Sequence, residues 1–146
     1  EEITSKKMQL NKADFRVLDL VENAIDVLIT KKDTVEIELI ENPVINVDFN
    51  FFSIAIKNLL DNAIKYGSSK PVVTIEYNLI KFSSQGVRLP KALSEYEMPL
   101  NKNYQSSKTG LGLGLYICHN IFKAHNFIFE HEYKDNCNIF TVKFAQ

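Results

Sequence analysis

The chain has 146 residues, of which 45% are hydrophobic, and its formal net charge is −1 at pH 7. This length suits one domain with one hydrophobic core, and the near-neutral charge argues against nucleic acid or an anionic membrane as a partner. Two cysteines are too few for a disulfide framework, and no apolar stretch reaches the 18 residues of a membrane-spanning helix. A reducing, cytosolic setting is therefore expected.

Hydrophobic periodicity in the first half of the chain predicts alternating helices and strands. Apolar spacings of three and four indicate helices, strict alternation indicates half-buried strands, and Gly67 and Pro71 are expected to end the second helix. In chain order we expect a helix over 14–28 capped by Asp14, strands over 35–39 and 44–47, a helix over 50–66, and a strand over 72–82.

The second half begins with an irregular stretch and ends with a hairpin. We expect a short helical turn near 91–96, a helix over 113–125, and strands over 127–133 and 138–144 joined around Lys134-Asp135-Asn136. Three helices and about five strands that are mostly antiparallel predict an α/β fold. Its architecture would be a two-layer sandwich of a mixed, mostly antiparallel sheet and three helices.

A polar stripe lies on the otherwise apolar helix predicted over 50–66. At 100° per residue, Asn58, Asn62 and Lys65 fall within roughly 60° of one another. An asparagine carbonyl oxygen suits a hard cation such as Mg²⁺, and a lysine ammonium suits phosphate. The alternative is a helix cap or a solvated helix face.

A glycine-rich segment precedes the helix predicted over 113–125. Gly110, Gly112 and Gly114 alternate with leucines, and glycines permit positive φ and a close approach of the backbone to a ligand. Consecutive N–H groups at a helix N-terminus can then bind an anion such as a polyphosphate. Alone, such a segment can also be a flexible turn. Together, the two motifs predict a metal and phosphate site.

These motifs resemble those of a known family. Residues 58–66 are similar to the N-box, and 110–114 to the second glycine box, of the catalytic and ATP-binding domain of a bacterial sensor histidine kinase. This domain belongs to an ATPase group that also includes DNA gyrase and the large heat-shock chaperones. The resemblance covers nearly the whole chain, and it implies a Bergerat-type fold with ATP and Mg²⁺ as cofactors.

The resemblance also implies roles for individual residues. Asn62 would bind Mg²⁺ with Asn58 as a possible second ligand, Lys65 would reach the phosphates, and Tyr66 would flank the nucleotide; Asn58 and Lys65 are the candidate catalytic residues. Residues 96–100 would correspond to the F-box and 101–109 to a short ATP lid. The remaining nucleotide-binding residues implied are Ser84, Gly86, Lys108, Thr109, Gly110, Leu111, Gly112, Leu113 and Gly114.

The first glycine box departs from the family pattern Asp-x-Gly-x-Gly, whose Asp accepts a hydrogen bond from the adenine amine. Counting back from Pro90, Ser84 stands in place of this Asp, and Arg88 stands in place of the second Gly. A hydrogen bond to a neutral hydroxyl is worth roughly half of one to a carboxylate. A second hypothesis is therefore a degenerate relative with weak or no nucleotide binding that serves as a signalling or docking module.

A third hypothesis, a gyrase-like hydrolase, is disfavoured by the residue at position 58. Gyrase-like ATPases carry a Glu there as general base, and Asn58 cannot accept a proton at neutral pH. Other residues of the N-box could have purely structural roles: Asp61 and Lys65 as solvated side chains, and Tyr66 as a core aromatic. We expect structural roles for all three histidines, which are His119, His125 and His131.

The phosphoacceptor histidine would therefore lie upstream of this chain. We expect residues 1–12 to be the tail of a dimerisation and phosphoacceptor helix or a linker, and 13–146 to be the catalytic and ATP-binding domain. The resemblance implies as partners the protein's own upstream domain and a response regulator, in a full-length protein that is a homodimer. No nucleic acid or membrane contact is expected of this domain, which would be the cytoplasmic part of an inner-membrane-anchored bacterial sensor.

Overall fold

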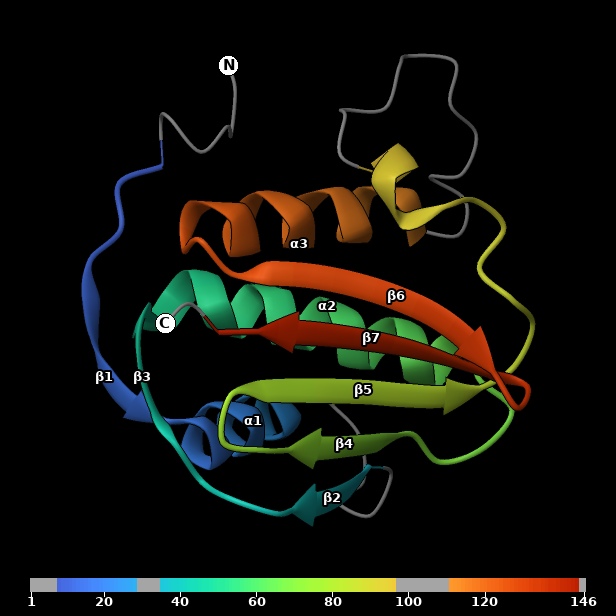
Figure 1. Cartoon of the computed structure of the whole chain (residues 1–146), viewed down its shortest axis with the longest axis horizontal. Coiled ribbons are helices and arrows are strands. Elements are labelled where there is room, and N and C mark those ends of the chain that lie inside the picture. Colours follow the sequence, from blue (N-terminus) through green and yellow to red (C-terminus); the bar gives the residue numbers. More distant parts are fainter. Residues whose placement is uncertain (1–7, 29–34, 97–110, 145–146) are drawn as a thin grey trace.

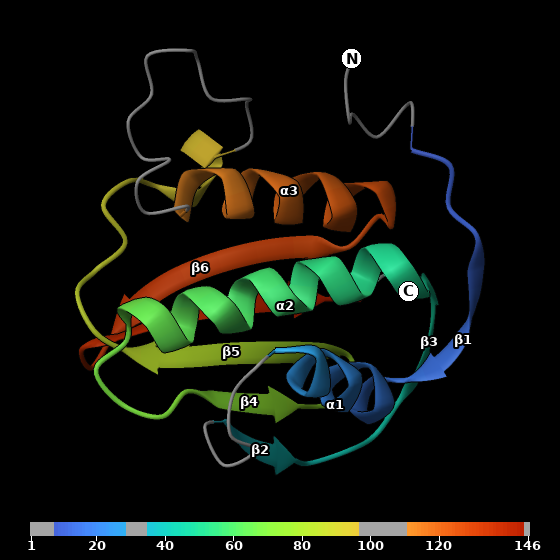
Figure 2. The same ribbon diagram turned by 180° about the vertical axis from the view of Figure 1, so that it is seen from behind.

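The computed structural model describes residues 8–28, 35–96 and 111–144. The chain folds into two layers, in which the helices pack on one face of a five-stranded sheet (Figures 1 and 2). The elements are β1 (Lys12–Arg16), α1 (Val17–Val27), β2 (Glu36–Leu39), β3 (Val44–Asp48), α2 (Phe49–Tyr66), β4 (Val72–Ile75), β5 (Leu79–Gln85), a 3₁₀ turn (Leu93–Tyr96), α3 (Leu111–Ala124), β6 (Ile128–Lys134) and β7 (Cys137–Lys143).

The main sheet is mixed and mostly antiparallel, as predicted. Its strand order is β2-β4-β5-β7-β6, and only β2 and β4 run parallel. Strands β1 and β3 form a separate antiparallel pair at one side of the molecule (Figure 1). Among the described helices, none has the length and apolar character needed to cross a lipid bilayer.

Helix α2 runs across the inner face of the sheet and carries the polar stripe. Its N-terminus is capped by Asp48, whose Oδ1 accepts a hydrogen bond of 3.0 Å from the Phe51 N–H. Its end is fixed by close packing at Gly67, where an added Cβ would lie 2.5 Å from the Ala63 carbonyl oxygen. One face of α2 is buried toward the core. Its residues are Phe52, Ala55, Ile56, Leu59, Leu60 and Ala63.

The hydrophobic core lies between this helical layer and the sheet. Strand residues that point inward, such as Ile75, Ile80 and Val142, are fully buried against the helices. An aromatic cluster joins α2, α3 and the start of β6, and the Phe52 ring meets Phe122 at 5.8 Å and Phe127 at 6.1 Å between centroids. The burial of one face of each element explains why the amphipathic patterns could be read from the sequence.

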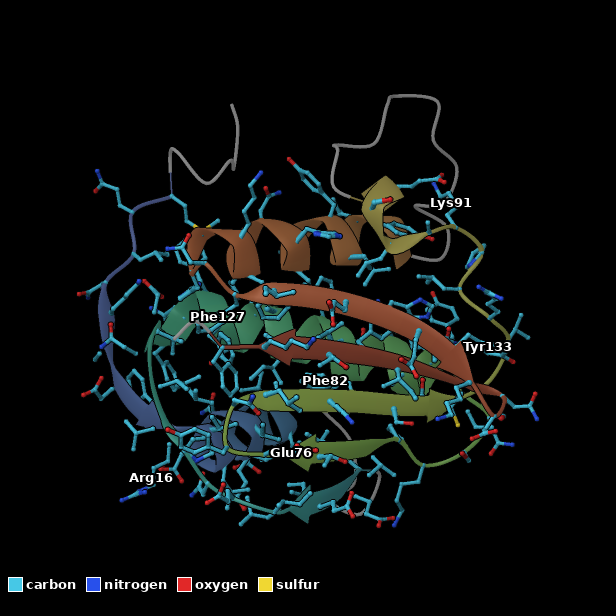
Figure 3. All side chains as sticks on the ribbon, in the orientation of Figure 1. Arg16, Glu76, Phe82, Lys91, Phe127 and Tyr133 are labelled. Carbon is cyan, nitrogen blue, oxygen red and sulfur yellow. The ribbon has the colours of Figure 1, made fainter. Side chains whose placement is uncertain are left out.

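Two expected elements differ in the structure. The expectation that Asp14 caps a helix is wrong: Asp14 lies in β1 opposite Asn46, whose side-chain amide donates to Asp14 Oδ1 at 2.8 Å. The backbone of β1 is satisfied by pairing with β3, so α1 begins only at Val17. The single strand expected over 72–82 is a hairpin of β4 and β5, with a turn at Glu76 (Figure 3).

The C-terminal hairpin is confirmed, with β6 and β7 in antiparallel register. Asp135 and Asn136 have φ values of 54° and 62°, which suit the two central positions of a tight hairpin turn. This turn places β7 between β5 and β6, and it leaves β6 at the edge of the sheet. The hairpin thereby supplies β7 as the neighbour of β5.

His125 joins the end of α3 to the start of α2. Its Nε2 accepts the Asp48 backbone N–H at 3.0 Å, so its Nδ1 carries the hydrogen that it donates to the Ile121 carbonyl oxygen at 2.8 Å. The Asp48 carboxylate also accepts the Asn11 backbone N–H at 2.8 Å. Burial lowers the pKa of His125 below 6.5, with a smaller effect in the same direction from Lys12.

This lowered pKa predicts a stability that depends on pH. The unfolded chain binds a proton at His125 more readily than the folded one, so this group's contribution is complete above about pH 6.5 and is lost as pH falls below it. In His125→Gln this loss should be absent, so the stability advantage of the wild type over the variant should shrink between pH 7.5 and 5. Urea unfolding across this pH range measures the difference in unfolding free energy between wild type and His125→Gln. A difference that stays constant with pH would contradict the lowered pKa of His125.

Candidate functional site

A cavity of about 370 Å³ lies between the C-terminal half of α2 and the sheet. Its floor is formed by inward-facing residues of β5 and β7, and one wall is the segment that follows β5. Apolar side chains predominate, as is typical of pockets for flat ligands such as a nucleobase. The lining residues are Leu59, Asn62, Ala63, Tyr66, Phe82, Ser84, Gln85, Gly86, Val87, Arg88, Leu89, Pro90, Leu115, Asn138 and Phe140.

Asn62 contributes a buried amide to this cavity. Its Nδ2 is inaccessible to solvent and has no hydrogen-bond partner among the described residues. Such a group costs free energy in the folded state, and a 180° rotation of the amide exchanges its nitrogen and oxygen. The side chain can therefore offer either a donor or an oxygen ligand to a guest in the cavity.

Gly114 brings the second motif against the first. A Cβ at Gly114 would lie 3.5 Å from Asn58 Oδ1 and 3.6 Å from Asn62 Nδ2, so the buried main chain of α3 packs closely against both amides at this residue. Gly114 lies inside the first turns of α3 rather than in a turn that precedes the helix, and its φ is not in the left-handed region. The expectation of positive φ is wrong for this glycine, whose role is close approach.

Gly114→Ala should separate stability from binding. Alanine favours a helix over glycine by up to about 1 kcal/mol, so the free energy of unfolding should rise. The new methyl group would contact the amides of Asn58 and Asn62 and occupy space beside them that a bound ligand would need, so affinity for Mg²⁺-ATP should fall by about tenfold or more. Thermal unfolding and nucleotide titration measure the two effects, with exposed Lys123→Ala on the same helix as the control. A Gly114→Ala variant that gained both stability and affinity for Mg²⁺-ATP would contradict a role for Gly114 at the binding site.

The other N-box residues lie around the cavity rather than all in it. Tyr66 lines the cavity and its side chain is 45% exposed, so it is not a core aromatic. Asn58 and Lys65 are not among the lining residues. The Lys65 ammonium is 3.1 Å from the Asp61 carboxylate, a pair one helical turn apart and well exposed on both sides. The structure thus brings Asn62 and Tyr66 into the cavity and leaves Lys65 at its periphery.

Ser84 and Gly86, two of the predicted nucleotide-binding residues, line the cavity. Ser84 stands opposite Asn138 of β7, and Gly86 follows the end of β5. An added Cβ at Gly86 would lie 3.1 Å from the Tyr66 carbonyl oxygen, so the end of α2 and this segment pack closely. The Gln85 carbonyl oxygen, which accepts the Ser68 N–H at 2.7 Å, reinforces this junction.

The segment from Gly86 to Leu89 is fastened to the β6–β7 hairpin. Gly86 donates its N–H to the Asn136 carbonyl oxygen and accepts from the Tyr133 hydroxyl, both at 2.9 Å. The Asn138 side chain donates to the Val87 carbonyl oxygen at 2.7 Å and accepts the Leu89 N–H at 3.0 Å. Figure 3 shows Tyr133 at this end of the sheet.

Sequence reasoning missed Tyr133 and Asn138. A signal existed for Asn138, because the alternation of β7 places it on the same inward face as Phe140 and Val142. A polar residue on an inward-facing position needs partners, which marks it as a candidate structural or binding group. The Arg88 guanidinium lies 5.8 Å from the centroid of the Tyr133 ring, at the rim of the cavity.

Each of the three histidine rings has a hydrogen-bond partner, in agreement with the structural roles expected. His119 Nε2 is 3.0 Å from the Leu93 carbonyl oxygen, and His131 Nε2 is 2.8 Å from Asn138 Oδ1. The first contact ties α3 to the 3₁₀ turn, where Tyr96 is almost fully buried beside Lys91. His125 makes the contacts given above.

Several predicted site residues cannot be compared with the structure. Lys108, Thr109 and Gly110 lie outside the described residues, as do the proposed lid over 101–109 and the F-box beyond Tyr96. Leu111 and Gly112 belong to the first turn of α3. Leu113 is 51% exposed and is not among the residues that line the cavity.

The donor set around the cavity suits a magnesium nucleotide. Within 8–28, 35–96 and 111–144, no group of three His, Cys, Asp or Glu side chains could hold a metal by itself. Mg²⁺ needs few protein ligands when a nucleotide supplies phosphate oxygens. The unpartnered Asn62 Nδ2 and the close approach of α3 at Gly114 fit such a group.

Comparison with known proteins gives the family. Residues 47–145 match the family described as histidine kinase-, DNA gyrase B-, and HSP90-like ATPase. The sensor histidine kinase ArsS of Helicobacter pylori is 33% identical over 147 residues, an alignment that covers 97% of this chain and 34% of that protein. The chain thus spans about a third of the length of this relative.

Solved structures share the fold. The histidine kinase AdeS of Acinetobacter baumannii superposes with a TM-score of 0.76 at 21% identity, covering 98% of this chain and 71% of that chain. The catalytic domain of the histidine kinase ThkA, in a nucleotide-free form, gives a TM-score of 0.72 at 19% identity, covering 93% and 96%. The chain therefore belongs to the histidine kinase-, DNA gyrase B- and HSP90-like ATPase family, and the relative and structures named here are histidine kinases.

Proposed function

We propose that this chain is the catalytic domain of a two-component sensor histidine kinase, which binds Mg²⁺-ATP and donates the γ-phosphate to a histidine of an upstream domain. The single observation that carries the proposal is the contact between the two motifs. At this contact, the unpartnered Nδ2 of Asn62 lies against Gly114, and Asn62 also lines an apolar cavity. Family membership supports ATP as the nucleotide.

In this proposal the chain mainly positions its substrate. The apolar cavity would hold the base, the asparagine amides would supply oxygen to Mg²⁺, and the bound metal would neutralise phosphate charge. In the transfer, the bond from the γ-phosphorus to the ADP oxygen breaks and a bond to the imidazole nitrogen forms. ADP leaves with the electron pair, and the imidazole proton goes to solvent.

Asn58 supports transfer over hydrolysis. Its Oδ1 lies beside Gly114, next to the proposed phosphate region, and an amide there cannot take a proton from water. An imidazole with a free lone pair needs no such base. The proposal therefore includes an upstream phosphoacceptor domain, a response regulator and a homodimeric full-length protein as partners, with this domain on the cytoplasmic side.

The test is a binding and transfer experiment with the chain and the upstream domain of its full-length protein. ATP titrated by calorimetry should bind with Mg²⁺ and much more weakly with EDTA. Labelled γ-phosphate should then move to a histidine of the upstream domain. Absence of ATP binding by the folded chain would overturn the proposal and favour the docking module, whereas rapid ATP turnover by the chain alone would favour the hydrolase.

A further inference from the structure

The nucleotide-base region of the cavity carries no negative charge. The residues that line it include Ser84, Gln85 and Asn138 but no aspartate or glutamate within the described ranges. Gln85 is already engaged, because its Oε1 accepts from the Ser69 hydroxyl at 3.2 Å. On the floor of the cavity, only neutral hydrogen-bonding groups are therefore available to distinguish one base from another, and the cationic Arg88 stands at the rim.

Ser84 and Asn138 are paired directly across β5 and β7, and both line the cavity. Directly opposed residues on one face of a sheet have Cβ atoms about 5 Å apart. The hydroxyl and the amide therefore lie side by side on the floor. Of the described polar groups on the sheet floor, they are the two placed to meet the edge of a flat base.

The Asn138 amide cannot adapt to different bases. Its oxygen accepts the Leu89 N–H and its nitrogen donates to the Val87 carbonyl oxygen, which fixes the amide's orientation. His131 Nε2 faces the same oxygen at 2.8 Å, so this nitrogen carries the imidazole hydrogen. Asn138 retains one amide hydrogen beyond these contacts and can act only as a donor there.

The Ser84 hydroxyl can adapt. None of the described residues hydrogen-bonds this hydroxyl, so its hydrogen is free to rotate. A hydroxyl both donates and accepts, so it can accept from the 6-amino group of adenine or donate to the 6-oxo group of hypoxanthine or guanine. A carboxylate can only accept, and it would repel a 6-oxo group.

We infer that this cavity binds 6-amino and 6-oxo purine nucleotides with comparable affinity, because the freely rotating Ser84 hydroxyl meets position 6 without a carboxylate beside it. The inference rests on the proposed function, since it takes the cavity as the base site of a purine nucleotide and places position 6 of the base at Ser84. It makes the phosphoryl donor a purine nucleoside triphosphate in general rather than ATP alone.

The test compares Mg²⁺-ATP with Mg²⁺-ITP, whose bases differ only in the 6-position and the N1 hydrogen that accompanies it. Calorimetry on the wild type should give dissociation constants within about fivefold of each other, since the Ser84 hydroxyl can accept from the one base and donate to the other. Ser84→Asp should shift the ratio toward ATP by about tenfold or more. Ser83→Asp is the matched control, because it puts the same charge on the neighbouring residue and the opposite face of the sheet.

The outcomes separate the two proposals. A wild type that prefers ATP over ITP by more than about tenfold overturns the inference and leaves the proposed function intact. Binding of neither nucleotide by the folded protein overturns the proposed function itself. If Ser84→Asp fails to fold, Ser84→Ala replaces it: loss of the hydroxyl should weaken both nucleotides by similar factors, and a loss confined to ATP would contradict the inference.

Discussion

Asn62→Ala is expected to weaken Mg²⁺-ATP binding on the order of 100-fold, because it removes a proposed metal ligand and leaves only Asn58 of the two proposed asparagine ligands. The same change should not destabilise the folded protein. The Asn62 Nδ2 has no partner among the described residues, and an unpartnered buried group costs about 1–3 kcal/mol in the folded state. Loss of binding with equal or greater stability would identify a side chain kept for its ligand.

Three measurements make this result specific. Asn50→Ala, an exposed asparagine at the other end of α2, should bind as the wild type does. In EDTA the difference between wild type and Asn62→Ala should largely disappear, because the lost interaction is with the metal. Urea unfolding without nucleotide gives the stability comparison. Unchanged Mg²⁺-dependent affinity in Asn62→Ala would remove the basis for the metal assignment.

Phe52→Ala is expected to lower the free energy of unfolding by about 3–5 kcal/mol, which is the usual cost of emptying a fully buried aromatic site. The Phe52 ring is completely buried and meets three rings edge-on, those of Phe122, His125 and Phe127. These neighbours belong to α3 and to the segment after it, so they cannot collapse independently into the space. Loss of this ring should therefore loosen α2 from α3.

Phe51→Ala is the matched control for this prediction. Phe51 is the preceding residue of the same helix and is only partly buried, so its loss should cost clearly less. Urea unfolding of the wild type, Phe52→Ala and Phe51→Ala gives the three unfolding free energies. They are comparable if the dependence of the free energy on urea concentration has the same slope in all three proteins. Equal losses at the two positions would show that the helix, and not the aromatic cluster, determines the cost.

The elements with strong local signals were predictable. α2 combines an apolar face with an N-cap and a terminal glycine, and the last hairpin carries Asp135-Asn136 at its turn. β1 was not predictable, because it is a strand only through pairing with β3, about thirty residues away along the chain. The turn between β4 and β5 contains no glycine or proline to mark it, so the sequence pattern predicted a single strand there.

The candidate site was predictable as motifs but not as an arrangement. Periodicity placed Asn62 on a helix and the glycine motif at the start of another, whereas the contact between Asn62 and Gly114 depends on the packing of α3 against α2. The Asp61–Lys65 ion pair follows the i, i+4 spacing of the sequence, which local rules alone predict. The contacts of Asn138 with the segment after β5 join residues about fifty positions apart, and no local pattern specifies them.

The fastening of residues 86–89 to the last hairpin has an evolutionary consequence. The four hydrogen bonds that hold this wall use main-chain groups of the segment, and none uses the side chain of Val87 or Arg88. Val87 is 87% exposed, and Arg88 is also exposed. Mutations at these two positions can therefore change the size and charge of the cavity's rim while the path of the backbone is retained. Such a wall lets ligand preference drift without a loss of the fold.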